Sequence, residues 1–225
     1  MYFKVLSMQP NEKDISLKTL QDIHGMMERS SRFLSLSGWS GVWAGCTAIA
    51  GAIVAKLMLA DIPDSYRAYY NQSNTISRSD PDYQAVVVKF VMLALIVLIV
   101  AVLGAIFFTQ KKAKKDGTTI WNTTSRRMFI EFSIPLLAGG IFASAFLLQG
   151  LELYIPAICL AFYGMALINS SKYTHSDIKY LGMLEVLLAC ICLFVRGYGI
   201  TFWLIGFGFL HILYGVIMWK KYDSR

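Results

Sequence analysis

The most constraining feature of this sequence is a long apolar segment without charge. Ala85 to Phe108 contains one charged residue, Lys89, and the nineteen residues after it carry none. At about 1.5 Å per residue, a helix over this segment is long enough to cross a hydrocarbon core of about 30 Å. The whole chain is 56% hydrophobic and 16% charged, whereas soluble domains are about 45–50% apolar and about 25% charged. We therefore predict an all-α integral membrane protein.

Six apolar stretches have the length and composition expected of transmembrane helices. They lie at about 34–60, 85–109, 128–149, 152–170, 180–196 and 199–219. The chain is thus expected to have a cytoplasmic or interfacial segment at 1–33, a six-helix transmembrane domain at 34–219 and a tail at 220–225. Because the first thirty residues are polar and lack the apolar centre of a signal peptide, the first span is expected to direct insertion.

The distribution of Lys and Arg predicts the orientation. Sixteen of these residues lie in the amino-terminal segment, the 110–127 and 171–179 loops and the tail, and five lie on or near the other side. Cytoplasmic loops are enriched in Lys and Arg, so both termini are expected in the cytoplasm of a bacterial inner membrane. The basic run KKAKK at 111–115 favours anionic lipid over nucleic acid as its partner.

Residues 29–45, RSSRFLSLSGWSGVWAG, lead into the first span. On a helix over 30–55, small residues fall within an arc of about 80°, and Trp39 and Trp43 lie on the other side; the small residues are Ser30, Ser37, Gly41, Gly45, Ala48, Ala52 and Ala55. Such a stripe lets helices approach closely in lipid, so we predict helix packing there. The alternative is a lipid-headgroup site, formed by Arg29, Arg32 and Ser35.

The segment 15–34 has the pattern of an amphipathic helix, with an apolar face formed by Leu17, Leu20, Ile23, Met27 and Leu34. We expect this helix to lie in the inner interface or to pack on its own membrane domain. Self-association or docking of a cytoplasmic protein is the alternative. Membrane lipids are the other expected partners, and no nucleic acid is expected.

No pattern in the sequence points to a cofactor or a metal. The cysteines Cys46, Cys159, Cys190 and Cys192 all lie within predicted spans, where cysteine is a small apolar residue. Cys190 and Cys192 would face different sides of a helix, which is not the spacing of a zinc site. No nucleotide-binding loop or Ser-His-Asp order is present, so no catalytic residue is assigned.

Ionisable residues inside spans are costly and therefore mark candidate sites. Glu185 shares a helix face with Gly182, and His211 shares one with Tyr214, so both groups are expected on packed sides at similar depth. Their contact would be either a structural hydrogen bond or a proton-linked site. Glu131, four residues after Arg127, is expected to form an ion pair with it at the membrane boundary, the alternative being a functional intramembrane carboxylate.

The carboxy-terminal half contains a candidate repeat. FYGMALINSSKY at 162–173 resembles LYGVIMWKKY at 213–222, and each segment ends a predicted two-helix hairpin. Two such hairpins in the same orientation would form a parallel repeat about an axis along the membrane normal.

Two family resemblances follow from these segments. LGMLEVLLACICLFVRGYGITFWLIGFGFLHILYGVIM at 181–218 resembles the hairpin unit of the bacterial acid-resistance membrane proteins built from tandem two-helix repeats. The start MERSSRFLSLSG resembles bacterial six-span inner-membrane proteins that carry no assigned activity. The first resemblance implies a hairpin architecture, and neither implies a catalytic residue.

Three classes of function remain open from the sequence. The first is a non-enzymatic inner-membrane protein of stress response, regulation or membrane assembly. The second is a small proton-linked transporter or channel-like oligomer that uses Glu185 and His211. The third is a lipid-modifying enzyme, which would need polar groups at the headgroup level around Arg29, Arg32 and Ser35.

Overall fold

The computed structural model describes residues 15, 17–20, 37–61, 81–118, 120–195 and 197–223. All regular structure in these residues is helical. The candidate headgroup residues Arg29, Arg32 and Ser35 lie outside the described residues, as does most of the predicted amphipathic helix at 15–34. Of that helix, Ile15, Leu17 and Leu20 are described, and each is more than half exposed.

The main α-helices, in chain order, are α2 (Gly38–Ala60), α4 (Pro81–Lys115), α5 (Thr123–Leu148), α6 (Ile155–Ser170), α7 (Ile178–Phe194), α8 (Gly199–Trp203) and α9 (His211–Met218). The helices from α4 onward follow one another with short connections, and twenty residues separate α2 from α4. The 3₁₀ turns η1 (Glu152–Tyr154) and η2 (Ser171–Tyr173) flank α6. The π-helical turn η3 (Leu204–Leu210) joins α8 to α9, and a second one, η4 (Trp219–Asp223), follows α9. The segment α8–η3–α9–η4 is therefore one continuous helix, called the last helix below.

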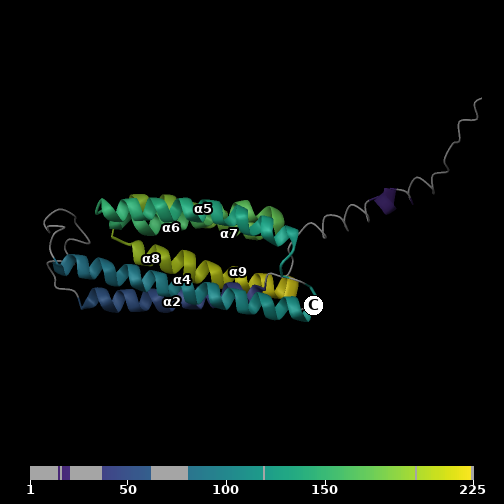
Figure 1. Cartoon of the computed structure of the whole chain (residues 1–225), viewed down its shortest axis with the longest axis horizontal. Helices are drawn as coiled ribbons and strands as arrows, with labels where there is room; N and C mark the ends of the chain where they lie inside the picture. The colour runs from purple at the N-terminus through teal and green to yellow at the C-terminus, as the bar shows by residue number, and fades with distance from the viewer. Residues whose placement is uncertain are drawn as a thin grey trace, which may run out of the picture.

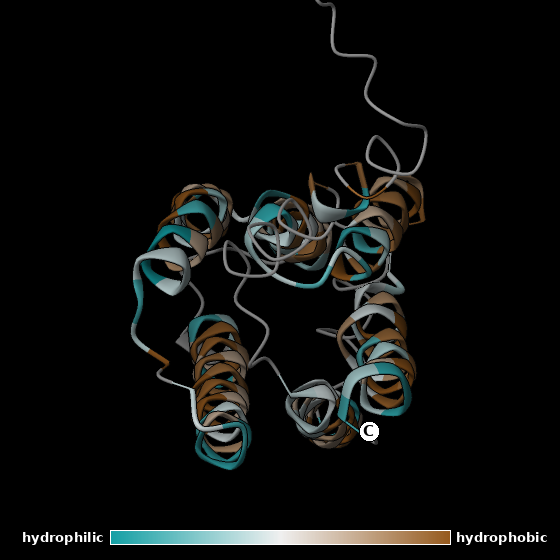
Figure 2. Cartoon of the chain, turned by 90° about the vertical axis from the view of Figure 1, so that its right-hand side faces the viewer, coloured by the Kyte–Doolittle hydropathy of each residue, from teal (hydrophilic) through white to brown (hydrophobic). Residues whose placement is uncertain are grey.

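Five helical segments are long and apolar enough to cross a membrane: Gly38–Ala60, Tyr83–Lys115, Thr123–Leu148, Glu152–Tyr173 and Gly199–Asp223. The sixth apolar helix, α7, is shorter, with 17 residues. Many large apolar side chains on these helices are exposed, and apolar residues run along the helix bodies (Figure 2). The chain is therefore an all-α helical bundle of the membrane-protein type.

The helices lie in two layers. Figure 1 shows α5, α6 and α7 in one layer, and α2, α4 and the last helix in the other. Within the layers, α6 packs between α5 and α7, and α2 packs against both α4 and the last helix. The start of the last helix also touches α6 and α7, so this helix joins the two layers.

Local sequence explains where several helices begin and turn. Ser37 is the N-cap of α2, and its hydroxyl accepts a hydrogen bond from the Trp39 amide, as capping serines do. Asn122 caps α5 in a reciprocal pair with Ser125. Gly150 occupies a left-handed backbone conformation at the tight connection between α5 and α6, and Gly197 does so between α7 and α8, where the chain leaves the α5–α7 layer. Glycine adopts this conformation without steric cost.

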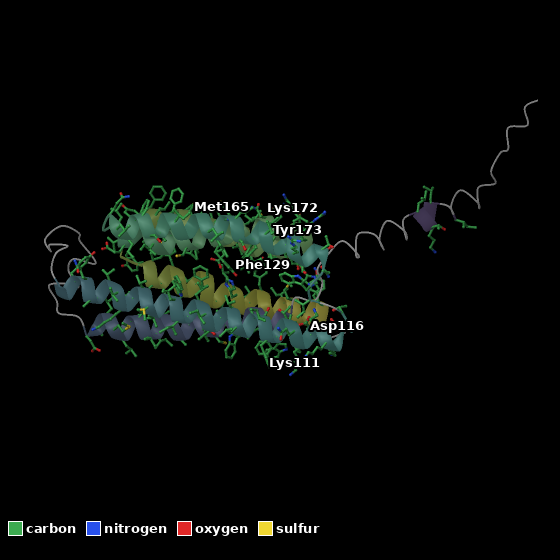
Figure 3. The ribbon with its side chains drawn as sticks, viewed as in Figure 1. Lys111, Asp116, Phe129, Met165, Lys172 and Tyr173 are labelled. Atoms are coloured by element: carbon green, nitrogen blue, oxygen red, sulfur yellow. The ribbon has the colours of Figure 1, made fainter. Side chains whose placement is uncertain are left out.

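The basic end of the bundle is formed by several helices together. Lys111, Asp116, Lys172 and Tyr173 lie at one end of the molecule in Figure 3. The second helix extends to Lys115, six residues beyond its predicted end at 109, because KKAKK consists of residues that favour helix. Its last turn lies outside the apolar span and places its lysines beside the carboxy-terminal residues.

Small residues of α2 lie against the last helix. A Cβ atom built on Gly45 would be 2.7 Å from the Gly208 carbonyl oxygen, and one on Gly41 would be 3.1 Å from the Gly215 Cα. The closest approach is at Gly38, where a built Cβ would meet the backbone of Trp219. Ala48 is 4% exposed. The absence of side chains here allows backbone to approach backbone.

Two side chains near the start of α2 have roles beyond the predicted arrangement. Ser37 caps the helix and is also buried, where its hydroxyl donates to Asp223 of the last helix. Trp43 does not simply face lipid: its indole N–H donates to the Val100 carbonyl oxygen at 3.0 Å, and its ring covers Gly104 of α4. A tryptophan donor that is removed from water finds a partner in this way, so this side of α2 is used to hold α4.

Candidate functional site

The most deeply buried charged residue among the described residues is Glu185, on α7, with 0% of its surface exposed. Neither of its carboxyl oxygens makes a hydrogen bond within the described residues. Its nearest polar neighbour is His211, whose Nδ1 lies 3.4 Å from Oε1. A buried carboxyl group without hydrogen bonds is costly, so this arrangement calls for a specific explanation.

The ring of His211 has two further partners, and they define its proton positions. Nδ1 lies 3.0 Å from the Gly206 carbonyl oxygen, and Nε2 lies 2.8 Å from the Tyr163 hydroxyl. Because a carbonyl can only accept, Nδ1 carries a hydrogen. In the neutral ring, Nε2 then accepts from the Tyr163 O–H. The same Nδ1–H edge faces Glu185 Oε1.

Aromatic rings enclose this cluster. Tyr163 packs edge-on against Phe207 and Phe132, with centroid distances of 5.2 and 6.0 Å. Trp203 covers the other side of Phe207 at 4.6 Å. His211 is 5% exposed. The apolar wall keeps the surroundings of the three polar groups low in dielectric, where their mutual interactions are strongest.

The π-helical turn shapes the space for the carboxyl group. A Cβ atom on Gly206 would lie 2.6 Å from Glu185 Oε2 and would also meet the end of the Leu160 side chain. The carboxyl group therefore rests directly against the backbone of η3. Single π-helical turns inside α-helices occur often at functional sites.

The cluster can hold a proton in more than one place. Its three side chains come from α6, α7 and the last helix, so it spans the contact between the two layers. A proton can reside on the Glu185 carboxyl or on the His211 imidazole, and the Tyr163 hydroxyl extends the chain of polar atoms from His211 back to the α5–α7 layer. Among the titratable groups of the described residues, the last helix places His211 against Glu185, and α6 places Tyr163 against His211.

The structure places the other two candidate residues elsewhere. Tyr214 packs on an apolar cluster that contains Leu167, Leu181 and Met218, and Glu131 makes no ion pair with Arg127 or with the Glu185 cluster among the described residues. The hydroxyl at the site belongs instead to Tyr163, which we had not singled out as a site residue. The signal was present, since Tyr163 and Tyr214 hold the same position in the two Tyr-Gly segments.

A separate polar cluster joins the layers at the basic end. Lys221 Nζ lies 2.7 Å from Asp177 Oδ2, and the Tyr222 hydroxyl donates to the same oxygen at 3.1 Å. Burial by itself would raise the pKa of Asp177, but the hydrogen bonds from Lys221 and Tyr222 outweigh it and hold that pKa below its usual value. The ring of His175 stacks on Tyr222 at 4.0 Å. This charged contact ties η4 to the loop between α6 and α7.

Asp223 forms the second contact at this end. One of its oxygens lies 2.6 Å from Lys112 Nζ. The other accepts hydrogen bonds from the Ser37 hydroxyl and the Gly38 amide at 3.1 and 2.9 Å. An acidic group at a helix amino terminus is favourable, so Asp223 fastens the end of the last helix to α2 and α4. We assign these contacts to stability.

No metal-binding group emerges from the described residues, since no three His, Cys, Asp or Glu side chains come together. The four cysteines are free thiols, and only Cys192 is buried. Comparisons with models of known protein families, with curated proteins and with solved structures find no match to this chain. Function is therefore inferred from the geometry of the Glu185 cluster.

Proposed function

We propose that this chain is a proton-linked transporter of the bacterial inner membrane, with six membrane-spanning helices and both termini in the cytoplasm. The observation that carries the proposal is the fully buried Glu185 carboxyl, whose nearest polar neighbour is His211 and which lies where the two helix layers meet. Many transporters place their ion site between two helical units that move relative to one another. A proton bound to the cluster of Glu185, His211 and Tyr163 would change the charge of the cluster and so alter the attraction between the two helix layers.

The size of the site favours a proton as its cargo. The Glu185 carboxyl lies against the Gly206 backbone, and the Tyr163 and His211 groups are already in hydrogen-bond contact. A larger ion at this position would have to displace one of these contacts. A proton fits on the Glu185 carboxyl without displacing any of these groups. A second proton on the imidazole would occupy Nε2, since Nδ1 already carries a hydrogen, and would make the Tyr163 hydroxyl the acceptor.

The six-span topology can be tested by labelling introduced cysteines from each side of the membrane. Cysteines placed in 65–80 should react from outside, and cysteines in 111–124 should react from the cytoplasmic side. The basis is the gathering of Lys111, Lys172 and Lys221 at one end of the bundle, together with the excess of basic residues in cytoplasmic loops. Labelling of both loops from the same side would eliminate this topology.

Proton linkage can be measured with the purified full chain. After a pH jump in detergent, a pH-sensitive dye should report uptake of about one proton per chain that is absent in Glu185→Gln, since the amide cannot bind a proton near neutral pH. In liposomes containing the same dye, an imposed proton gradient should be dissipated faster by the wild type than by Glu185→Gln.

The matched control is Glu131→Gln, which removes a second glutamate that lies outside the cluster and should leave both signals unchanged. Equal proton uptake by the wild type and Glu185→Gln would refute a proton site at Glu185. Uptake without any flux in liposomes would refute transport and leave a structural pair.

A second candidate is a non-enzymatic role in stress response, regulation or membrane assembly through a cytoplasmic partner. The observation in its favour is the exposure of Ile15, Leu17 and Leu20 on one short helical piece, which leaves an apolar surface for docking. A lipid-modifying activity has no comparable support, because its candidate residues Arg29, Arg32 and Ser35 lie outside the described residues.

The tandem repeat of the carboxy-terminal half remains part of the proposal. Both Tyr-Gly segments place their glycine at a close helix crossing: a Cβ on Gly164 would lie 2.7 Å from the Gly182 carbonyl oxygen, and one on Gly215 would lie 2.8 Å from that of Gly38. The two hairpins differ in packing, because α6 packs closely on α5 whereas the last helix packs mainly on α2. The support for the repeat is therefore the shared Tyr-Gly position and its close crossing, and not the packing of the two hairpins.

A further inference from the structure

The two glycines of the π-helical turn face opposite layers. Gly206 faces Glu185 and Leu160 of the α5–α7 layer, whereas Gly208 faces Ile49 of α2, with 2.8 Å between a built Cβ and the isoleucine Cγ1. Both glycines are buried. The turn is therefore held between the layers, and each glycine accommodates a side chain from one of them.

Gly206 touches both members of the proposed proton site through different atoms. The side on which a Cβ would stand is occupied by the Glu185 carboxyl, at 2.6 Å from the built atom. Its carbonyl oxygen accepts from His211 Nδ1 at 3.0 Å, five residues further along the chain. Five residues is the spacing at which a π-helical turn brings groups together, so the wide turn aligns the imidazole with this carbonyl.

We propose that Gly206 is a positioning residue of the site: it admits the Glu185 carboxyl to the backbone and orients the His211 ring toward it. This inference rests on the proposed proton-linked function. A methyl group at position 206 would push the carboxyl out of the place it shares with His211 Nδ1. The carbonyl contact and the Tyr163 hydroxyl would continue to hold the ring, so the carboxyl is the group that moves.

The decisive measurement is the melting temperature as a function of pH, for pairs of proteins that differ only by Glu185→Gln. In the otherwise wild-type protein, Glu185→Gln should change this pH profile between about pH 5 and pH 9, a range that spans the ordinary titration of imidazole. In Gly206→Ala, adding Glu185→Gln should change the profile at most half as much. In the control Gly208→Ala, which lies in the same turn and meets Ile49, the Glu185→Gln effect should remain as in the wild type.

A merely structural role for Gly206 would lower the melting temperature of Gly206→Ala at every pH and leave the effect of Glu185→Gln intact, which would overturn the inference. An equal loss of the effect in Gly208→Ala would also overturn it. Absence of any Glu185→Gln effect in the wild type would instead count against the proposed function itself, and the two failures are therefore distinguishable.

A second change separates the steric effect of the carboxyl from that of its neighbours. Leu160→Val removes the Cδ atom that the new methyl would meet first, which leaves the Glu185 carboxyl as the closest obstacle and the end of the flexible Leu188 side chain at 3.3 Å. In this background, we expect Gly206→Ala to give several-fold less folded protein when Glu185 is present than when it is replaced by alanine. Equal folded yields with and without the carboxyl group, including failure of both proteins to fold, would contradict the proposed contact.

Discussion

Leucine at position 45 or 215 should strongly reduce the folded yield of this protein. A Cβ on Gly215 would lie 2.6 Å from the Val42 backbone nitrogen, and one on Gly45 would lie 2.7 Å from the Gly208 carbonyl oxygen. Backbone atoms within packed helices cannot yield as a flexible side chain can, so either leucine would separate α2 from the last helix. We expect a loss of about 3 kcal/mol or more in stability, at the upper end of overpacking effects. The measurement is thermal unfolding in detergent.

The matched control is Gly140→Leu, because a Cβ on Gly140 meets nothing within 4 Å. This exposed position of α5 should accept leucine without loss and with a gain in helix propensity. Trp43 is unsuitable as a control, since its indole holds α4. If Gly140→Leu were as damaging as Gly45→Leu and Gly215→Leu, the close crossing of α2 and the last helix would not be the cause.

Replacing either Glu185 or His211 by glutamine should also lower stability by a large amount. Each change leaves the other group buried with a lost partner, and breaking a buried pair costs about 3–5 kcal/mol. The double variant should lose at least about 1 kcal/mol less than the sum of the single losses, because neighbouring groups couple. Thermal or denaturant unfolding of the four proteins gives this coupling directly.

Glu131→Gln provides the reference for this double-mutant cycle. Combined with His211→Gln, it should give additive losses, because Glu131 lies outside the cluster. Strict additivity of Glu185→Gln and His211→Gln would show that the 3.4 Å approach of the two groups carries no energy. It would remove the physical basis of the proposed proton site.

The helical and apolar character of the chain could be predicted because it depends on local pattern. A segment such as 90–108 can satisfy its backbone in lipid as a helix, and its apolar side chains need no specific partner. The ends of helices were less predictable. The second helix continues through KKAKK to Lys115, since hydropathy marks where a span leaves lipid and not where its hydrogen bonds stop.

The structure brings Glu185 and His211 together, as the sequence predicts, but the neighbouring hydroxyl is that of Tyr163 and not of Tyr214. Glu185 and His211 were singled out because ionisable residues are rare in apolar helices, and their shared depth follows from helix geometry. Tyr214 was included because it shares a face with His211 along one helix. The hydroxyl that reaches His211 comes from Tyr163 on another helix, which no periodicity within 199–219 can indicate.

Local pattern is enough to predict that this chain forms apolar helices, which residues carry charge inside them, and where small residues allow close approach, because each of these properties depends on one segment and its solvent. Which helices meet depends on the tertiary structure. It placed the last helix against α2, opened the π-helical turn at Leu204–Leu210, and set the Glu185 carboxyl on the backbone of Gly206. These choices depend on packing between segments far apart in the chain, where many pairings of similar apolar helices differ by little energy and the fit of particular side chains selects one.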